Sequence, residues 1–505
     1  MQLILGGIRS GKSRFAERLA AATGLPVRYL ATADPREPGM AARIAAHRSR
    51  RPPGWQTVEL SLELQTGLAE SGGLCLLLDG FGLLLARALE RGEAFARRWL
   101  GEAVAALAAA DAQEVLVVSE AVGEALLPTN PLARSWLELL GEANQLLAER
   151  ARRVALVLAG RPVWLKGGGE GAGDRYHGDL EVGAGELDFA VNVAAVERPR
   201  WLEAALARGL ENIRPYPDQS AARQALARRH GVDPEAVLPT NGAAEALWLA
   251  AFALRPAFAA CIHPAFSEGE SALRAAGAIV ARVLRSPQRR FALEPERVPE
   301  EAELVVVANP GSPCGTLHPA ERILALRRPG RIVVVDEAFM DFLPDQEASL
   351  AFPPPPGVVV VRSLTKLLGI AGLRVGYLLG EPQLVARLGG FQQPWAANNL
   401  ALAVLAEAAR RPRELAALAR RLQGHRQDLE RRLADLPGLR FFPGAANFLL
   451  ARVADGRRVL AELHRRGLAV RPGWTFPGLD HRYLRITARR PRENAVLVKA
   501  LQEVV

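Results

Sequence analysis

The chain has 505 residues, of which 49% are hydrophobic and 23% are charged, a balance typical of globular proteins. A chain of this length is too long to fold around one ordinary hydrophobic core, so we expect two or three domains. The net charge is +10, yet no dense basic run or interleaving of aromatic and basic residues occurs. This pattern argues against a nucleic-acid partner and is compatible with small anionic substrates.

Three cysteines, Cys75, Cys261 and Cys314, are widely scattered and fit neither a disulfide framework nor a metal motif. No apolar run has the length of a membrane span. The first residues enter a glycine loop and show no cleavage pattern of a signal peptide. We therefore expect a cytoplasmic protein without a membrane span.

Short apolar runs alternate with helical patterns in the first part of the chain. Five runs have the composition of buried parallel strands: LILGG, VRYLAT, LCLLLD, EVLVVS and VALVLAG. Helical patterns between them include residues 13–22 and 132–150. The alternation predicts an α/β domain with a mainly parallel sheet.

A glycine-rich segment follows, with six glycines between Gly167 and Gly178. Such a segment offers little to pack, so we place a linker at residues 167–176. The domains on either side then comprise residues 1–166 and 177–505. An ordinary long loop is the alternative.

The second part begins with helices and continues with the apolar runs AACIH, LVVVAN, RIVVVDEAF, VVVVRSL and VGYLLG. Near Pro394 the pattern changes to long helices rich in arginine and leucine. Three candidate strands come after these helices: FLLARV, LAVRP and YLRITA. This order predicts a large α/β domain with a smaller α+β domain behind it.

The first predicted strand leads into the first predicted helix through a phosphate-binding pattern, GxxxxGK[ST]. Its residues are Gly6, Gly7, Ile8, Arg9, Ser10, Gly11, Lys12 and Ser13. Backbone N–H groups at the helix start can hold phosphate oxygens, Lys12 can reach the terminal phosphates and Ser13 can ligate Mg²⁺. Asp79 ends the strand LCLLLD and could supply a carboxylate on the metal side. The segment therefore predicts a nucleotide site.

Further motifs follow in order: GGIRSGKS, YLATA, MAARIAAH, RPPGW, AVGEALLPTNPLAR and GEANQLLA. Together they resemble the adenosylcobinamide kinase/adenosylcobinamide-phosphate guanylyltransferase family over residues 1–166. The resemblance implies phosphorylation of adenosylcobinamide and GMP transfer from GTP, with ATP or GTP, Mg²⁺ and a guanylylated histidine that falls on His47. It also implies nucleotide contacts beyond the phosphate loop at Thr32, Arg48, Arg51, Glu59 and Asp79.

A neutral His47 imidazole could attack the α-phosphorus of GTP. Met40, Ile44 and His47 have the spacing of one helical face. The chain departs from the family where Glu120-Ala121-Val122-Gly123 replaces Asn-Glu-Val-Gly, and where Gly39 replaces an acidic residue. A GTP-binding domain with weakened catalysis is therefore the alternative.

Lys366 is one of four lysines among 64 cationic residues and follows an apolar run, between hydroxyl residues. A shielded lysine can lose its proton and attack a carbonyl, whereas arginine stays protonated. The surroundings suit pyridoxal 5′-phosphate (PLP), because Ser363, Thr365 and Arg374 could grip a phosphate. Asp336, at the end of a buried strand, could keep the pyridine nitrogen protonated.

Other PLP contacts are expected upstream. Asn241, Gly242 and Ala243 open a predicted helix and offer a second phosphate contact. Asn309 could hydrogen-bond the phenolic oxygen of the ring, and Phe266 could stack on its face. In this order the motifs resemble the fold-type I aminotransferase family, which implies that Lys366 binds PLP covalently.

Within that family, motifs such as HGDL, DFAVN, RSLTKLLGIAGLRVGY and LAVRPGWTFPGLD resemble threonine-phosphate decarboxylase over residues 175–505. The resemblance implies conversion of L-threonine O-3-phosphate to (R)-1-amino-2-propanol O-2-phosphate. Implied substrate contacts are His177, Gly178, Asn192, Asn309, Arg471 and Arg485.

Arg485 would suit a carboxylate and Arg471 another anionic group. Both resemblances point to cobalamin biosynthesis and to a homodimer or higher homo-oligomer. A histidinol-phosphate-type aminotransferase fused to a GTP-binding domain stays open as the alternative.

Overall fold

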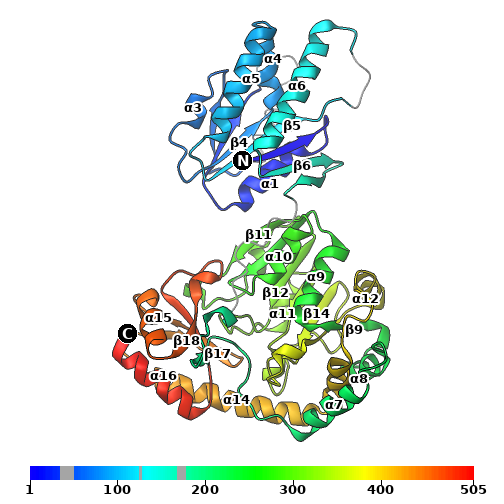
Figure 1. The fold of residues 1–505 in the computed structure, drawn as a ribbon, viewed down its shortest axis with the longest axis vertical. Coiled ribbons are helices and arrows are strands. Elements are labelled where there is room, and N and C mark those ends of the chain that lie inside the picture. The colour runs from blue at the N-terminus through cyan, green and yellow to red at the C-terminus, as the bar shows by residue number, and fades with distance from the viewer. Residues whose placement is uncertain (34–50, 124–127, 168–177) are drawn as a thin grey trace. The chain divides into compact units, whose positions relative to one another are not determined.

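The computed structural model describes residues 1–33, 51–123, 128–167 and 178–505. The chain divides into two compact units, Met1–Gly171 and Ala172–Val505, and each has a main sheet of its own (Figure 1). Predicted residues Met40, Ile44, His47, Arg48 and His177 lie outside the described ranges, as do linker residues 168–176. In the described ranges, no helix has both the length and the apolar character needed to cross a membrane.

The first unit contains a seven-stranded sheet in the order β3-β2-β4-β5-β1-β6-β7. Six strands run parallel, and β7 pairs antiparallel with β6. The strands are β1 (Gln2–Gly6), β2 (Val27–Ala31), β3 (Gln56–Glu59), β4 (Cys75–Asp79), β5 (Glu114–Glu120), β6 (Arg153–Leu158) and β7 (Arg161–Lys166). The five predicted strands are present. The edge strands β3 and β7 escape prediction because they are largely exposed and lack a continuous apolar run.

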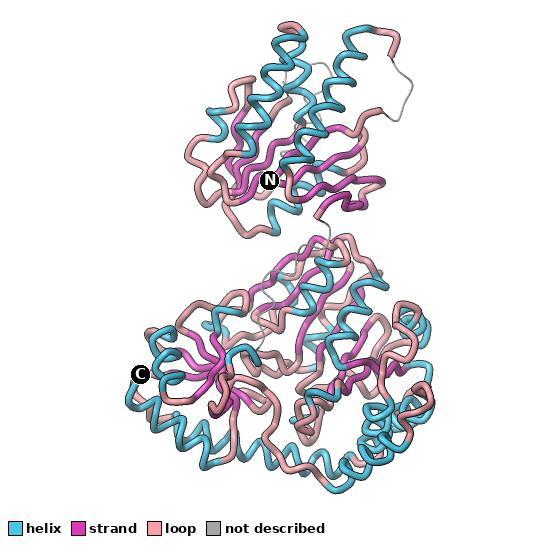
Figure 2. Tube along the Cα trace, in the orientation of Figure 1, coloured by secondary structure: helices cyan, strands magenta, loops and turns pink. Residues whose placement is uncertain are grey.

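Helices pack on this sheet, as the tube in Figure 2 shows. They are α1 (Lys12–Ala22), α3 (Gln65–Leu68), α4 (Phe81–Leu89), α5 (Glu93–Ala108) and α6 (Pro131–Arg150). Helices α4, α5 and α6 share one core with alternate strand residues such as Leu76, Leu78 and Val117. Asn130 caps α6, since its side chain accepts hydrogen bonds from the first backbone N–H groups of the helix.

The second unit contains a larger lobe with a seven-stranded sheet in the order β11-β10-β12-β13-β14-β15-β9. Only β15 runs antiparallel to its neighbours among these described strands. The strands are β9 (Val237–Asn241), β10 (Phe258–His263), β11 (Ile279–Leu284), β12 (Leu304–Ala308), β13 (Ile332–Asp336), β14 (Val358–Ser363) and β15 (Val375–Leu379).

Two groups of helices accompany the larger sheet. Helices α9, α10 and α12 pack together on β13, β14 and neighbouring strands, while α7, α8 and α13 form a group that contacts β9 and β15. The helices up to this point are α7 (Arg200–Glu211), α8 (Ser220–His230), α9 (Gly242–Leu254), α10 (Glu268–Ala275), α11 (Ala320–Leu324), α12 (Pro382–Gly389) and α13 (Asn399–Ala409).

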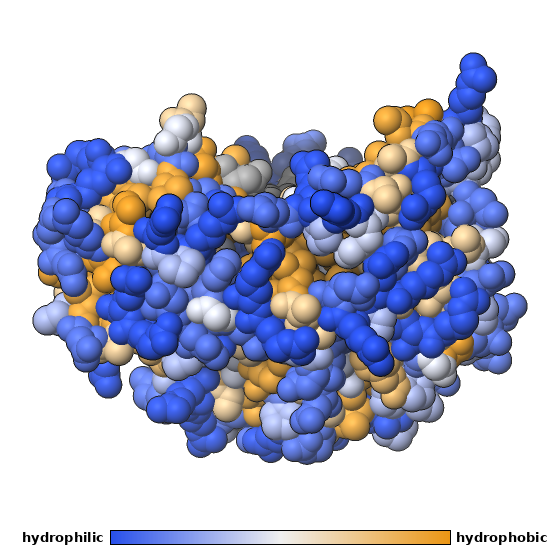
Figure 3. Space-filling view, turned by 90° about the horizontal axis from the view of Figure 1, so that it is seen from below, coloured by the Kyte–Doolittle hydropathy of each residue, from blue (hydrophilic) through white to orange (hydrophobic). Residues whose placement is uncertain are grey.

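A smaller lobe completes the second unit with a five-stranded sheet in the order β16-β17-β19-β18-β8. Its strands are β8 (Leu187–Phe189), β16 (Arg440–Phe442), β17 (Phe448–Arg452), β18 (Leu468–Pro472) and β19 (Tyr483–Thr487). Its helices are α14 (Pro412–Leu433), α15 (Gly456–Arg465) and α16 (Pro491–Val504). Helix α14 buries a leucine stripe, including Leu422 and Leu429, and exposes most of its arginines. The face in Figure 3 is accordingly mostly hydrophilic.

Both units place polar residues where strands of a parallel sheet end. In the first unit Gly6 pairs with Glu120 and Ala31 pairs with Asp79. In the second unit, Ala308 pairs with Asp336. The carboxyl edge of an α/β sheet is where such proteins bind ligands. Among the predicted residues, Gly6, Asp79 and Asp336 thus lie at the edges where the fold favours a site.

We propose domains at residues 1–166 and 177–505 joined by a linker at residues 167–176. Each unit has its own sheet and core, so a protease site inserted between Gly167 and Gly173 should release two soluble fragments that unfold cooperatively. Thermal unfolding followed by circular dichroism on each purified fragment checks this. Aggregation of either fragment, from a chain that is soluble when intact, would contradict these boundaries.

Candidate active sites

The first candidate site is the loop between β1 and α1. Gly11 has a φ of 92°, a left-handed conformation that favours glycine. A Cβ on Gly6 would lie 2.4 Å from the Ser10 Oγ, so the turn is too tight for a larger residue. The exposed residues Ile8 and Arg9 form its tip. The loop therefore opens its backbone towards the start of α1, as phosphate binding requires.

Asp79 is the centre of the hydrogen bonds beside this loop. Its carboxylate accepts hydrogen bonds from Ser13 Oγ (2.9 Å) and from the Tyr29 hydroxyl (2.5 Å). Thr32 Oγ1 donates to the Asp79 carbonyl at 2.7 Å. The structure thus brings together Ser13, Thr32 and Asp79 from three segments. The pair of a hydroxyl and a carboxylate oxygen suits a hard cation such as Mg²⁺.

Lys12 lies between the phosphate loop and Glu120, which stands where the related family has asparagine. Its Nζ donates to Gly7 O at 3.3 Å and lies 3.7 Å from Glu120 Oε1. Burial raises the pKa of Glu120, and the positive charge of Lys12 opposes this rise. Although Ala121 lacks the expected carboxyl group, Glu120 places one beside the phosphate loop.

The other predicted nucleotide contacts are less tightly grouped. Glu59 ends β3 and is exposed, two strands away from Asp79 in the sheet order. The Arg51 guanidinium stacks on the Tyr29 ring, with its Cζ 3.3 Å from the ring centroid. Through Tyr29, Arg51 is connected to the Asp79 cluster.

The second candidate site is a cavity of about 710 Å³ in the second unit, of the size of small-molecule sites. Predicted residues that line it are Gly178, Asn192, Phe266, Asp336, Lys366, Arg374, Arg471 and Arg485. Asn241, Gly242, Ala243, Asn309, Ser363 and Thr365 are not among the lining residues. Predicted residues from the larger and the smaller lobe therefore line one cavity.

Lys366 and Asp336 face the same cavity from neighbouring strand ends. Burial lowers the pKa of Lys366 to about 8, an effect that Asp336 opposes and that Arg485 and Arg374 reinforce. Burial also raises the pKa of Asp336, opposed by Lys366. The lysine Nζ lies 4.1 Å from the Phe339 ring centroid. A substantial share of Lys366 is therefore neutral near pH 8, as a nucleophilic amine requires.

A buried ion cluster fixes these two strand ends from behind. Arg362 and Glu337 are fully buried, and the Arg362 Nη1 lies 3.1 Å from Glu337 Oε2. The other guanidinium nitrogen lies 2.8 Å from Asp341 Oδ1. Arg362 precedes Ser363, and Glu337 follows Asp336. Because successive side chains of a strand alternate in direction, this cluster and the cavity lie on opposite sides of β13 and β14.

Arg374 and the start of α9 form the expected phosphate end. Arg374 has a left-handed φ of 57°, and its Nη1 donates to Ala371 O at 3.1 Å. A Cβ on Gly242 would lie 2.7 Å from Arg374 Nη2, so the glycine admits the guanidinium at the helix N-terminus. Ser363 Oγ and Thr365 Oγ1 are 2.7 Å apart and hydrogen-bond each other. These groups supply cationic, backbone and hydroxyl donors in one region.

The Asn309 side chain is bound to the backbone of His318 and does not line the cavity. Its side chain donates to His318 O (3.0 Å) and accepts from His318 N (2.7 Å). The amide retains one further N–H. Phe266 is 37% exposed and lines the cavity.

Two arginines from the smaller lobe line the opposite side. Arg471 and Arg485 are cross-strand partners on β18 and β19. Burial and Arg471 lower the pKa of Arg485 to about 9. Arg485 donates to Ser312 Oγ at 2.9 Å and to Ala190 O. Two buried arginines thus line this cavity, which also contains the carboxyl groups of Asp336 and Glu268. Arginine side chains of this kind can bind anions.

The sequence does not single out some other residues that line the cavity, although the motifs that it contains include them. Phe339 lies far in the chain from the adjacent residues Thr475 and Phe476, but all three line the same cavity. The Phe476 ring centroid lies 5.1 Å from the Arg471 Cζ and 5.8 Å from the Arg485 Cζ. An aromatic residue between two arginines is visible only once β18 and β19 are paired.

Comparisons with known proteins match each unit separately. Residues 2–165 match the family model "Cobinamide kinase / cobinamide phosphate guanyltransferase", and residues 178–501 match "Aminotransferase class I and II". A histidinol-phosphate aminotransferase of Mycobacterium tuberculosis is 46% identical over 338 residues, which are 66% of this chain and 91% of the relative. A threonine-phosphate decarboxylase of Salmonella typhimurium is 32% identical over 334 residues, 63% of this chain and 91% of the relative.

Solved structures agree with the fold of the second unit. An L-threonine-O-3-phosphate decarboxylase from Porphyromonas gingivalis is 28% identical, with a TM-score of 0.56, covering 62% of this chain and 98% of the other. A histidinol-phosphate aminotransferase from Clostridium acetobutylicum has a TM-score of 0.59 at 21% identity, covering 63% of this chain and 98% of the other.

The second unit matches a family whose members use PLP as cofactor, and the first unit is a cobinamide kinase/cobinamide phosphate guanyltransferase domain. The chain therefore belongs to the aminotransferase class I and II family.

Proposed function

We propose that this chain is a bifunctional enzyme of cobalamin biosynthesis. The second unit decarboxylates L-threonine O-3-phosphate to (R)-1-amino-2-propanol O-2-phosphate. The first unit phosphorylates adenosylcobinamide and transfers GMP from GTP to adenosylcobinamide phosphate. The presence of the cobinamide kinase/guanyltransferase match in the same chain carries the proposal, because the decarboxylation product is the arm that such corinoids contain.

The residues of the second cavity fit PLP. Asp336 is buried, with no ion-pair partner among the described residues, and could pair with a protonated pyridine nitrogen. Lys366 could bond the cofactor covalently, and Arg374 with the start of α9 could hold its phosphate. When bound, PLP draws electrons from the substrate Cα and so eases loss of its carboxylate.

The protein residues then have to orient the substrate and move a proton. Threonine phosphate carries a carboxylate and a phosphate, which match Arg485 and Arg471 respectively. If both anionic groups of the substrate are held, the orientation of its Cα, and hence the bond that breaks, is fixed. Lys366 Nζ, with a pKa lowered to about 8, can deliver a proton near neutral pH.

A histidinol-phosphate aminotransferase is the second candidate. It is favoured by the 46% identity to the mycobacterial relative of that name. Histidinol phosphate carries a phosphate but no carboxylate, so one of the two arginines would serve the amino-group acceptor instead. The use of an oxoacid therefore separates the two reactions.

In the first unit, Lys12 and the loop N–H groups would offset phosphate charge, while Ser13 and Asp79 would hold Mg²⁺. His47 would attack the α-phosphorus of GTP and release pyrophosphate. A phosphate oxygen of the corinoid would then attack phosphorus and free His47.

We also propose a cytoplasmic location. It is supported by the cysteines at positions 75, 261 and 314, which are buried and form no disulfide, as is usual in a reducing compartment. We further propose a homodimer or higher homo-oligomer.

The purified chain with PLP should release carbon dioxide from L-threonine O-3-phosphate without any oxoacid. Two anion-binding arginines and the fused cobinamide domain both favour this outcome. Carbon dioxide release and 2-oxoglutarate consumption are measured in parallel with threonine phosphate and histidinol phosphate. Transamination of histidinol phosphate, with no carbon dioxide from threonine phosphate, would establish the second candidate instead.

Covalent attachment of PLP to the cofactor-free chain should speed up as the pH rises through about 8 and level off above it. The Lys366 pKa is lowered to about 8, so the reactive neutral amine is lost below that pH. The rate is followed by the visible absorbance of the bound cofactor at a series of pH values.

Lys366→Arg is the control, because it keeps the charge but cannot form the bond. It should show no such absorbance and no turnover, while GTP binding by the first unit is unchanged. Retained absorbance in this variant would disprove the role of Lys366.

α-Labelled GTP should leave label covalently bound to His47. An unperturbed histidine with a pKa of ~6.5 is mostly neutral at pH 7 and can attack phosphorus. A phosphorus–nitrogen bond should make the adduct labile to acid and stable to base. Label retained by the wild-type protein is compared with that of His47→Ala. Equal labelling of the two proteins would refute this role.

A further inference from the structure

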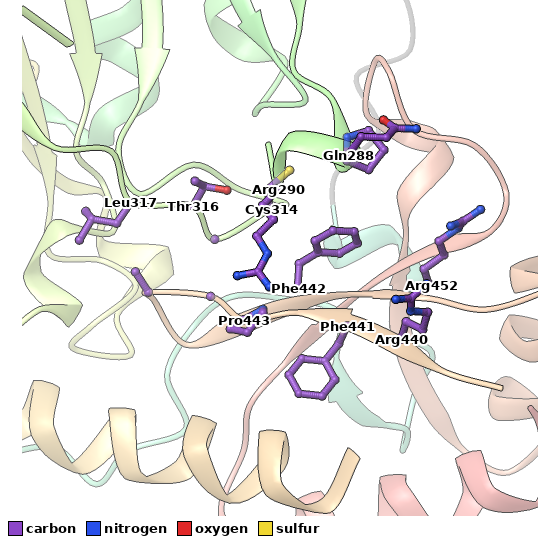
Figure 4. A pocket seen from close by; sticks show the side chains of 14 residues that line it. Gln288, Arg290, Cys314, Thr316, Leu317, Arg440, Phe441, Phe442, Pro443 and Arg452 are labelled. Carbon is purple, nitrogen blue, oxygen red and sulfur yellow. The ribbon is translucent and has the colours of Figure 1, made fainter. Parts of the chain in front are cut away.

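The second unit contains another cleft of about 710 Å³ that shares no lining residue with the Lys366 cavity. Figure 4 shows its residues reaching in from three segments: the turn with Gln288 and Arg290, the loop with Cys314 and Thr316, and the strands with Arg440 and Arg452. The first two belong to the larger lobe and the third to the smaller lobe. The cleft therefore lies where the lobes meet.

The charge of this cleft is entirely positive. Arg290, Arg440 and Arg452 line it, and no aspartate or glutamate is among its lining residues. Within the described part of the chain, none of the three guanidinium groups forms an ion pair, whereas the nearby Arg289 pairs with Glu294. Burial raises the pKa of the Cys314 thiol to about 12, so the thiol adds no negative charge.

The arrangement of these arginines opposes stability. Arg440 and Arg452 are direct cross-strand partners on β16 and β17. Like charges directly opposite one another in a sheet destabilise it. Arg290 and Phe291 both adopt a left-handed φ, at 50° and 56°. The buried Phe291 ring packs at 5.0 Å on Phe442, so this turn holds Arg290 at the rim of the cleft.

The remaining walls suit a ligand that is anionic and partly planar. Phe441 and Phe442 are half-buried and line the cleft beside the arginines. Gly315 and Gly444 meet at the wall, where a Cβ on Gly315 would lie 2.5 Å from the Gly444 Cα. Arginine forks bind phosphate through paired hydrogen bonds, and their planes and aromatic rings can stack on a base.

We propose that this cleft binds a polyphosphate group, as carried by a nucleotide or by inorganic polyphosphate. The site is separate from the proposed catalytic sites and does not depend on their chemistry. The loop that forms its wall also reaches the catalytic cavity. Ser312 lines that cavity and accepts from Arg485, while Cys314 and Thr316 line the cleft. An occupant would thus join the lobes beside the substrate arginines.

The test is hydrogen–deuterium exchange of the full chain with GTP, GDP or tripolyphosphate at millimolar concentration. Peptides covering residues 286–292 and 438–446 should exchange more slowly with ligand in the wild-type protein. Arg440→Gln/Arg452→Gln should weaken the apparent affinity for this protection about tenfold for each arginine removed. The same variant should be no less stable to heat, because it removes two opposed charges.

Arg413→Gln/Arg420→Gln is the matched control, since both arginines are exposed on α14, outside the cleft. It removes the same charge and should keep the protection. Protection by tripolyphosphate alone would assign the site to phosphate groups, and protection that needs GTP or GDP would assign it to a nucleotide.

Peptides covering residues 6–13 report binding at the phosphate loop separately, so a failure there leaves this inference standing. Absence of protection at the cleft with every ligand, or equal protection in the Arg440→Gln/Arg452→Gln variant, would overturn the inference.

Discussion

The buried pairing of Arg362 with Glu337 and Asp341 is the constraint on which the second unit depends. It ties β13 to β14 behind the cavity, one residue away from both Asp336 and Ser363. Removing one partner of such a pair leaves an uncompensated buried charge and typically costs about 3–5 kcal/mol. The cluster therefore fixes where Asp336 and Lys366 can lie. Both of these residues line the cavity itself, where a ligand with complementary groups can reach them.

Residues at strand ends were the part of the site that the sequence could predict. Asp79, Asp336 and Lys366 each follow a continuous apolar run, and a parallel sheet brings such ends to one edge. Phe339, Thr475 and Phe476 belong to motifs that are recognisable in the sequence, but they could not be placed at the cavity in this way. Their position depends on how the two lobes pack. The exposed edge strands β3 and β7 were missed for a different reason, since they lack the apolar run of a buried strand.

The arginine pairs of the smaller lobe were equally hard to predict from the sequence. In a chain with 64 cationic residues, the sequence gives little reason to single out Arg440 and Arg452. The strand register places them opposite each other, and it likewise pairs Arg471 with Arg485 in the catalytic cavity. Both pairs lie in the smaller lobe and face the larger one. In both proposals, a cross-strand pair of arginines in this lobe supplies the positive charge for an anionic ligand.

The most direct test of the proposed chemistry is to locate the lysine that holds PLP. The PLP-loaded chain is treated with borohydride, which makes the bond between cofactor and lysine permanent, and is then digested and mapped by mass spectrometry. We predict the added mass on the peptide that contains Lys366, and on none that contains Lys12, Lys166 or Lys499. Modification of another lysine, with Lys366 unmodified, would contradict the assignment.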